Sequence, residues 1–128
     1  MSNLNTVITI KGRENMAKAR AGLATMPVIT GMAFGDGGVD GSGVPIPPVA
    51  NATALNNELY RKAMTSITAI TATTIEYKCQ LSASELTGQD ISELGLYDAN
   101  GDLVMIKTFV VKSKGADEVL TFAVDDAF

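Results

Sequence analysis

Hydrophobic and polar positions alternate most clearly between Ile75 and Leu81, where every second residue is apolar or cysteine and those between are polar. A two-residue period is typical of a strand with one buried face. Asp90 to Asp98 and Leu103 to Val111 are two further apolar runs, and Asn100-Gly101 between them predicts a hairpin because both residues tolerate positive φ. Val119 to Val124 predicts the last strand.

The first third of the chain predicts two strands and one helix. Leu4 to Ile10 is rich in β-branched residues and predicts a short strand that ends at Gly12. Arg13 to Ala24 contains four alanines and apolar residues at helical spacing, so it predicts a helix that Pro27 stops. Val28 to Phe34 predicts the second strand.

The middle of the chain begins with a sharp change of composition. Gly35 to Pro48 contains five glycines and three prolines, which predicts a long ordered loop. Loops of this length in a compact domain are usually functional or poorly ordered. Thr53 to Asn57 is expected to form a turn of helix, Glu58 to Ile70 one long strand, and Thr71 to Thr74 a turn.

These elements predict an α+β fold: an antiparallel meander or sandwich with one short N-terminal helix and the Gly/Pro-rich loop 35–48. We expect residues 1–128 to form a single domain. Leu103 to Val111 and Val119 to Val124 carry more apolar side chains than one short helix can cover, which favours contact between copies of the chain. The alternative is a two-layer sandwich closed by the N-terminal strands.

Composition excludes several classes of function. The net charge is -4 and no basic block occurs, so we expect no binding to nucleic acid or to an anionic membrane surface. No apolar stretch approaches the ~20 residues of a membrane span, and no signal peptide is visible. The single cysteine, Cys79, lies on the apolar face of a predicted strand and is expected to be a buried, inert thiol in a protein that folds in the cytoplasm.

The sequence offers little catalytic chemistry. It lacks histidine, which removes the commonest general base and most metal sites. The glycine-rich segment has no lysine at the position that a phosphate-binding loop requires. Asp98, Asn100 and Asp102 are better explained as turn residues than as calcium ligands. Asp36 and Asp40 could hold a cation together with loop carbonyls, but Asp-Gly is also ordinary turn chemistry. We therefore expect no enzyme activity, no catalytic residue, no metal and no cofactor.

Four segments together resemble one known family. They are MAFGDGG (Met32 to Gly38), ALNNELYR (Ala54 to Arg61), IEYKCQL (Ile75 to Leu81) and SELGLYDANGDLV (Ser92 to Val104). In this order and spacing they resemble the N-terminal domain of phage tail-collar fibre proteins. That domain carries a G-D-G loop after a strand, then an L-x-N-E-x-Y-R segment, then an E-[IL]-G-L-x-D-x-x-G-x-L hairpin.

The resemblance implies a structural protein of a phage tail, or of a phage-tail-like bacteriocin, that anchors a homotrimeric fibre to the baseplate and is assembled in the bacterial cytoplasm. Its partners would be other tail and baseplate proteins and further copies of the chain. The residues that carry over would have structural or interaction roles, and they are Gly35, Asp36, Gly37, Asn57, Glu58, Tyr60, Arg61, Glu93, Gly95 and Leu96. Members usually continue into a shaft and a receptor-binding tip, whereas this chain ends at Phe128, so receptor binding is not expected.

Two other functions stay open from the residues alone. One is a module that binds carbohydrate or the host surface, and the other is a small hydrolase that uses paired carboxylates. A further hypothesis concerns Arg61, a charge in an apolar setting, which we expect to pair with Glu93 or Glu58 and so fix the strand register. The alternative is that each of these side chains points to solvent.

Overall fold

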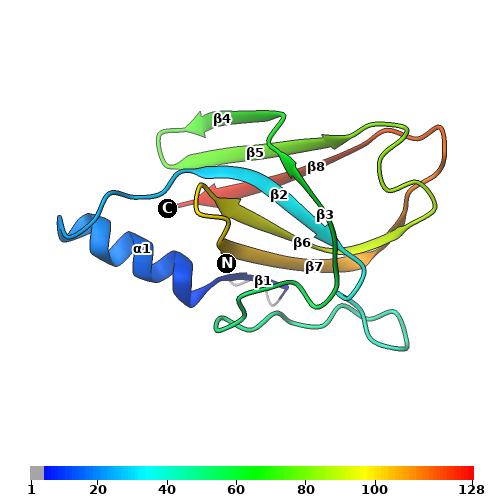
Figure 1. Ribbon diagram of the computed structural model, residues 1–128, viewed down its shortest axis with the longest axis horizontal. Coiled ribbons are helices and arrows are strands. Elements are labelled where there is room, and N and C mark those ends of the chain that lie inside the picture. Colours follow the sequence, from blue (N-terminus) through cyan, green and yellow to red (C-terminus); the bar gives the residue numbers. More distant parts are fainter. Residues whose placement is uncertain (1–4) are drawn as a thin grey trace.

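The chain folds into two antiparallel sheets and one helix. A computed structural model describes residues 5–128 (Figure 1). The elements in chain order are β1 (Thr6–Ile8), α1 (Ile10–Arg20), β2 (Ile29–Gly35), β3 (Glu58–Ala63), β4 (Ser66–Thr71), β5 (Thr74–Leu81), β6 (Asp90–Asp98), β7 (Leu103–Ser113) and β8 (Leu120–Ala127). The predicted α+β class, mostly antiparallel sheet with one short helix, is confirmed.

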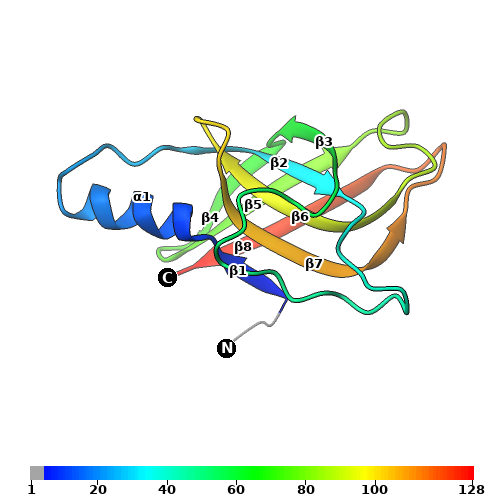
Figure 2. The ribbon, with the colours of Figure 1, turned by 60° about the horizontal axis from the view of Figure 1, so that its bottom comes forward.

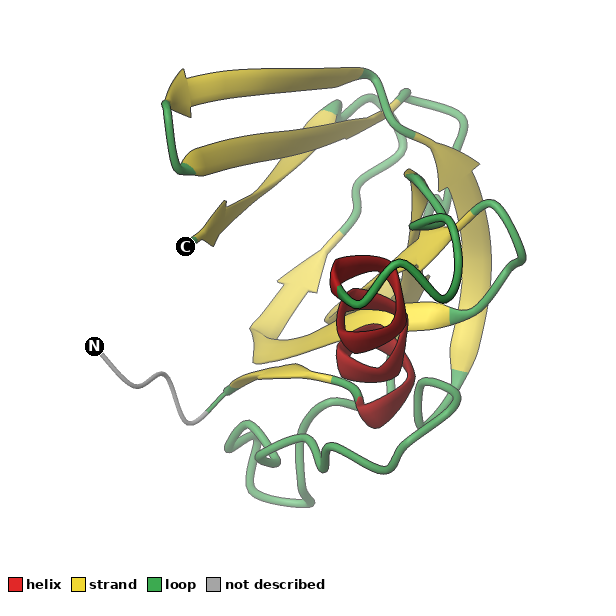
Figure 3. Cartoon of the chain, turned by 90° about the vertical axis from the view of Figure 1, so that its left-hand side faces the viewer, coloured by secondary structure: helices red, strands yellow, loops and turns green. Residues whose placement is uncertain are grey.

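Five strands form one sheet in the order β1-β7-β6-β2-β3, and three form the other in the order β4-β5-β8. Figure 3, seen from the end of the molecule where α1 lies, shows the two sheets curving around a common interior. Phe34 of the larger sheet and Phe122 of the smaller one meet there, with ring centroids 5.1 Å apart. Cys79, Leu81 and Val124 join the same hydrophobic core.

The strands of the second half do not form one meander. The hairpin of β6 and β7 belongs to the larger sheet, whereas β8 leaves β7 and pairs with β5 in the smaller one. The predicted hairpin itself is confirmed, but only Gly101 in its turn has positive φ, at 82°. The first half of β7 is buried within the chain, with Val104 and Met105 in the main core and Leu103 and Ile106 in a second cluster. The fold has two layers, as in the alternative, but β4, β5 and β8 form the second layer and the N-terminal strands do not. Contact between copies stays a prediction.

The helix begins earlier than predicted. Thr9 caps it by accepting a hydrogen bond from the backbone of Gly12, and the same hydroxyl donates to the carbonyl of Leu103 at 2.8 Å. Gly12 therefore lies inside the first turn and does not end the strand before it. A Cβ at Gly12 would lie 2.6 Å from the Val104 carbonyl, so glycine allows α1 to lie close against β7. The predicted first strand began at Leu4, which lies outside the described residues.

The helix also ends before Pro27. Its last residue is Arg20, and Gly22 follows with φ at 75°. The backbone N–H of Leu23 then donates to the carbonyl of Lys18 at 2.8 Å, which satisfies one of the last carbonyls of the helix. Pro27 lies in the segment that leads into β2.

Within residues 5–128, no helix is long and apolar enough to cross a bilayer.

The predicted strand from Glu58 to Ile70 is broken in the middle. Met64 donates its backbone N–H to Thr30 of β2, and Thr65 donates its own to Lys78 of β5. Consecutive residues thus bind different sheets, so β3 ends just before them at Ala63 and β4 begins just after them at Ser66. The turn after β4 is confirmed by the pairing of Thr71 with Thr74. The helical turn expected at Thr53 to Asn57 is wrong, because those residues contain no helix.

Candidate functional site

Glu93 lies in the middle of β6 and is buried, with an exposed fraction of 1%. One of its oxygens accepts the backbone N–H groups of Gly37 at 2.9 Å and Asn57 at 2.8 Å. The other accepts the backbone N–H of Asn56 at 2.9 Å. A buried carboxylate is tolerated when such donors surround it. Glu93 therefore holds the two ends of the segment between β2 and β3 against β6.

The glycines of the G-D-G motif are required by this close approach. A Cβ at Gly35 would lie 2.4 Å from the carbonyl oxygen of Asn57 and 2.5 Å from a Glu93 oxygen. A Cβ at Gly37 would lie 2.6 Å from the Cβ of Asn56. Neither position has room for a larger residue. The motif therefore keeps the backbone close enough to bind the Glu93 carboxylate.

Asp36 lies between these glycines, with its side chain exposed. It accepts a hydrogen bond from the side-chain amide of Asn57 at 2.6 Å, and the Asn56 amide donates to the carbonyl of Gly37 at 2.9 Å. The backbone N–H of Asp36 donates to the Asn57 carbonyl as well. Gly35, Asp36, Gly37, Asn57 and Glu93, all expected from the sequence, are thus brought together, while Asn56 was missed.

Residues 36–57, which we name the anchored segment, are also fastened further along their length. Gly38 donates its backbone N–H to the Ser92 hydroxyl at 2.9 Å, and Thr108 of β7 donates its hydroxyl to the Ile46 carbonyl at 2.8 Å. Asp40 accepts the backbone N–H groups of Ser42 and Val44, which closes a tight turn. The carboxylate of Asp40 therefore binds backbone N–H groups within the segment.

The anchored segment presents apolar side chains to solvent. Val44, Ile46 and Val49 have exposed fractions of 55%, 38% and 60%. Behind them, Leu55 is buried against Ala33 and Ile106 on the outer face of the larger sheet. The segment is thus attached to the sheet by polar groups and by Leu55. Its exposed apolar side chains, Val44, Ile46 and Val49, are not covered by any other part of residues 5–128.

Arg61 forms a second cluster on the neighbouring strand, β3. Its guanidinium pairs with Glu58 at 2.8 Å, donates to the Gly101 carbonyl at 2.8 Å and lies over the Tyr97 ring at 4.9 Å from the centroid. The hydrogen bond with Glu58 raises the pKa of Arg61. Of the two partners proposed for Arg61, Glu58 is confirmed and Glu93 is wrong, because the Glu93 oxygens bind backbone N–H groups.

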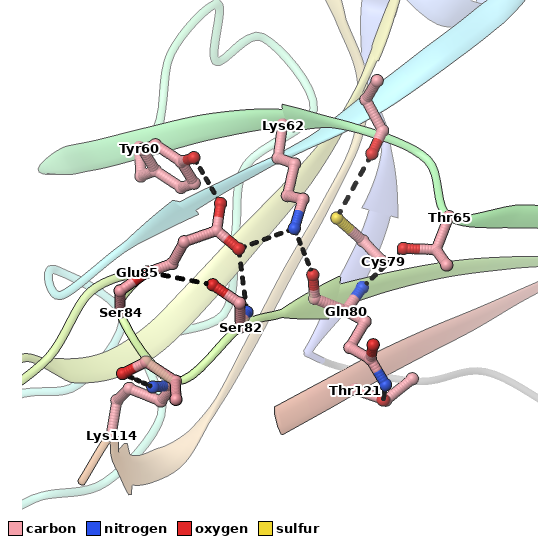
Figure 4. A network of polar contacts seen from close by, with 12 residues as sticks. Tyr60, Lys62, Thr65, Cys79, Gln80, Ser82, Ser84, Glu85, Lys114 and Thr121 are labelled. Atoms are coloured by element: carbon pink, nitrogen blue, oxygen red, sulfur yellow. Dashed lines mark hydrogen bonds and ion pairs between the residues drawn. The ribbon is translucent and has the colours of Figure 1, made fainter. Parts of the chain in front are cut away.

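Tyr60 belongs to a third group, shown in Figure 4, that sequence reasoning missed. Its hydroxyl donates to Glu85, and the same carboxylate lies 2.6 Å from the ammonium of Lys62. Lys62 also donates to the Gln80 carbonyl at 2.6 Å. Hydrogen bonds from Lys62, from the Ser82 backbone and from Tyr60 lower the pKa of Glu85 to about 2. This group ties β3 to the loop after β5.

Gly95 and Leu96, the remaining predicted site residues, lie in the middle of β6 and serve packing. A Cβ at Gly95 would lie 2.8 Å from a methyl carbon of Leu103, and Leu96 is fully buried in the core. Cys79 is buried as expected, and desolvation raises the pKa of its thiol to about 11. The Asp98 carboxylate accepts the backbone N–H groups of Asn100 and Asp102, so it shapes the hairpin turn.

The contacts of the motif residues hold together segments of the chain that lie far apart in sequence. Within the described part of the chain, no three Cys, Asp or Glu side chains are grouped to hold a metal ion, and no fully buried polar side-chain atom lacks a partner. The motif residues fix an exposed segment on a rigid sheet, which suits a surface that binds another protein.

Comparison with known proteins identifies one family. The family described as phage tail-collar fibre protein, N-terminal, matches residues 1–121 of the 128-residue chain. The match spans the whole anchored segment and every strand up to the start of β8. No curated protein matches the chain.

Proposed function

Since the chain belongs to the phage tail-collar fibre protein family, within its N-terminal region, we propose that it anchors or forms part of the connection between a tail fibre and the baseplate. A structural role in a phage tail follows from the family itself. The finer proposal is that residues 1–128 act as one attachment domain, which binds a neighbouring tail protein through the anchored segment.

The observation that carries this proposal is the contrast between the two sides of the anchored segment. Its inner side is fixed by three hydrogen bonds to the buried Glu93 carboxylate. Its outer side exposes Val44, Ile46 and Val49. A segment that is already held in one conformation loses little entropy when it binds a partner, and exposed apolar side chains gain by being buried.

Binding to carbohydrate, the alternative function, has less support. Recognition of sugars by stacking requires free aromatic faces. Tyr60 is bound to Glu85, and Tyr97 lies half-buried beneath the Arg61 guanidinium. Tyr77 is half-buried as well.

Incorporation into tail particles tests the proposal. The gene would be deleted from a strain that produces the particle, and the tagged chain supplied in trans. We expect the wild-type chain to co-purify with tails. The amount of the Val44→Glu/Val49→Glu variant that co-purifies should be lower by about tenfold or more, because burying a charge at an interface costs more than 1.4 kcal/mol of binding free energy. Ile70→Glu, at a similarly exposed position on β4, is the matched control and should be incorporated normally.

Two results would contradict the proposal. One is that the wild-type chain is absent from purified tails. The other is that Val44→Glu/Val49→Glu and Ile70→Glu are incorporated equally well. A chain absent from tails that binds a glycan array or whole cells would support the carbohydrate-binding alternative.

A further inference from the structure

The helix α1 and the carboxyl terminus lie at the same end of the molecule (Figures 1 and 2). Residues of both elements line an apolar groove there. Its volume is about 490 Å³, within the range of ~300–1,000 Å³ typical of ligand-binding pockets. Its walls come from both sheets, from α1 and from the segment before β2, and they include Met16, Val28, Ile67, Tyr77 and Phe128. Val28, Ile67 and Phe128 are themselves more than half exposed. No residue of the anchored segment lines this groove.

One charged residue, Asp126 of β8, lies in the groove wall. Its side chain is half-buried, and the ion pairs and hydrogen bonds within residues 5–128 leave it without a partner. Burial raises the pKa of Asp126. The pKa of Tyr77 is raised mainly by burial and to a smaller extent by the nearby charge of Asp126. A complementary occupant is therefore apolar and carries one cation that can reach this carboxylate.

The chain itself presents such a segment just after α1. Leu23 has an exposed fraction of 79%, the highest among the large exposed hydrophobic residues. The positive φ of Gly22 and the hydrogen bond from Leu23 to Lys18 fix its position. Arg20, three residues earlier, is exposed and forms no ion pair within the described residues. Leu23 does not line the groove of its own chain.

We propose that a second copy of this chain inserts Leu23 into the groove and pairs its Arg20 with Asp126. The groove and the Leu23 turn both adjoin the α1 end of the molecule, so two copies can exchange the contact reciprocally, or each copy can pass it to the next in a closed ring. This contact uses a surface other than the anchored segment and goes beyond the proposed attachment.

Sedimentation equilibrium of the purified 128-residue chain, from about 1 μM to about 1 mM, measures the association directly. We expect a dimer or a ring to form in this range. Leu23→Glu and Asp126→Arg should each raise the dissociation constant by about tenfold or more. Ile70→Glu, which adds the same charge at an exposed position outside the groove wall, should leave the constant unchanged.

Exchange of the two charges gives the sharpest test. Arg20→Glu alone should weaken association, and Arg20→Glu combined with Asp126→Arg should restore it. Circular dichroism would confirm that each variant is folded. A wild-type chain that is monomeric throughout the range would overturn the proposal, as would Leu23→Glu without effect or a charge exchange that fails to restore association. The anchored-segment variant Val44→Glu/Val49→Glu should associate normally, so a failure of this contact and a failure of tail attachment are separate results.

Discussion

The carboxylate of Glu93 lies 2.9 Å from the backbone nitrogen of Gly37, which is 56 residues earlier in the chain. This contact binds the start of the anchored segment to β6. The end of the segment is bound to the same strand, through the backbone N–H groups of Asn56 and Asn57. The contact with Gly37 links two of the family's motifs, the G-D-G loop and the E-x-G-L hairpin, through one buried side chain. The relationship predicts which substitutions weaken the fold at the proposed attachment surface.

Glu93→Gln should destabilise the chain by about 2–3 kcal/mol, because an amide keeps one acceptor oxygen and leaves buried backbone N–H groups unpaired. Urea unfolding followed by circular dichroism measures the loss. Asp117→Asn, the same kind of change at an exposed carboxylate, should have an effect within about 0.5 kcal/mol. Equal stability of the two variants would show that the three hydrogen bonds of Glu93 contribute nothing.

Gly35→Ala should lower the free energy of unfolding by about 2–3 kcal/mol. The added methyl group would lie 2.4 Å from the carbonyl oxygen of Asn57, so the backbone must shift. Gly41→Ala is the matched control, because a Cβ there meets nothing within 4 Å and the backbone is not in the left-handed region. Thermal unfolding of both variants makes the comparison. A Gly35→Ala protein as stable as Gly41→Ala would mean that the close approach at the motif is not required.

Arg61→Ala should cost about 1–2 kcal/mol, the sum of a partly exposed ion pair, a carbonyl hydrogen bond and a cation–π contact. A double-mutant cycle with Glu58→Ala isolates the ion pair and should give a coupling of about 0.5 kcal/mol. Arg61→Lys should keep part of the stability. If Arg61→Ala left the melting temperature unchanged, the proposal that the pairing of Arg61 stabilises the fold would be wrong.

Acid should weaken the fold through Glu85. The folded-state pKa of about 2 lies below the usual value of 4.5, so the contribution of Glu85 is fully present above pH 4.5. It is lost progressively as the pH falls from 4.5 towards 2. Unfolding free energies measured across this range should therefore fall less steeply for Glu85→Gln than for the wild type. Asp117→Asn serves as the control and should follow the wild-type slope; a Glu85→Gln slope equal to it would contradict the prediction.

The sequence pattern predicted those elements in which the preference of neighbouring residues agrees with the contacts made in the folded chain. The alternation from Ile75 to Leu81 predicted β5, and the turn residues Ala99 to Asp102 predicted the hairpin of β6 and β7. The helix was found but displaced, because Thr9 and Gly12 gain their roles from contacts with Leu103 and Val104. A cap and a close approach to another strand are not visible in the spacing of apolar residues.

The candidate site was predicted in its parts and not in its connections. The sequence alone set the alternation of buried and exposed faces, the glycines that permit close approach and the isolated charges in apolar runs, since each depends on neighbouring residues. Only the tertiary structure decided that Glu93 binds Gly37, that Glu85 meets Lys62, and that the chain changes sheets between Met64 and Thr65. Partners far apart in sequence are chosen by which strands pair and which loops close, and the local pattern is compatible with several such choices.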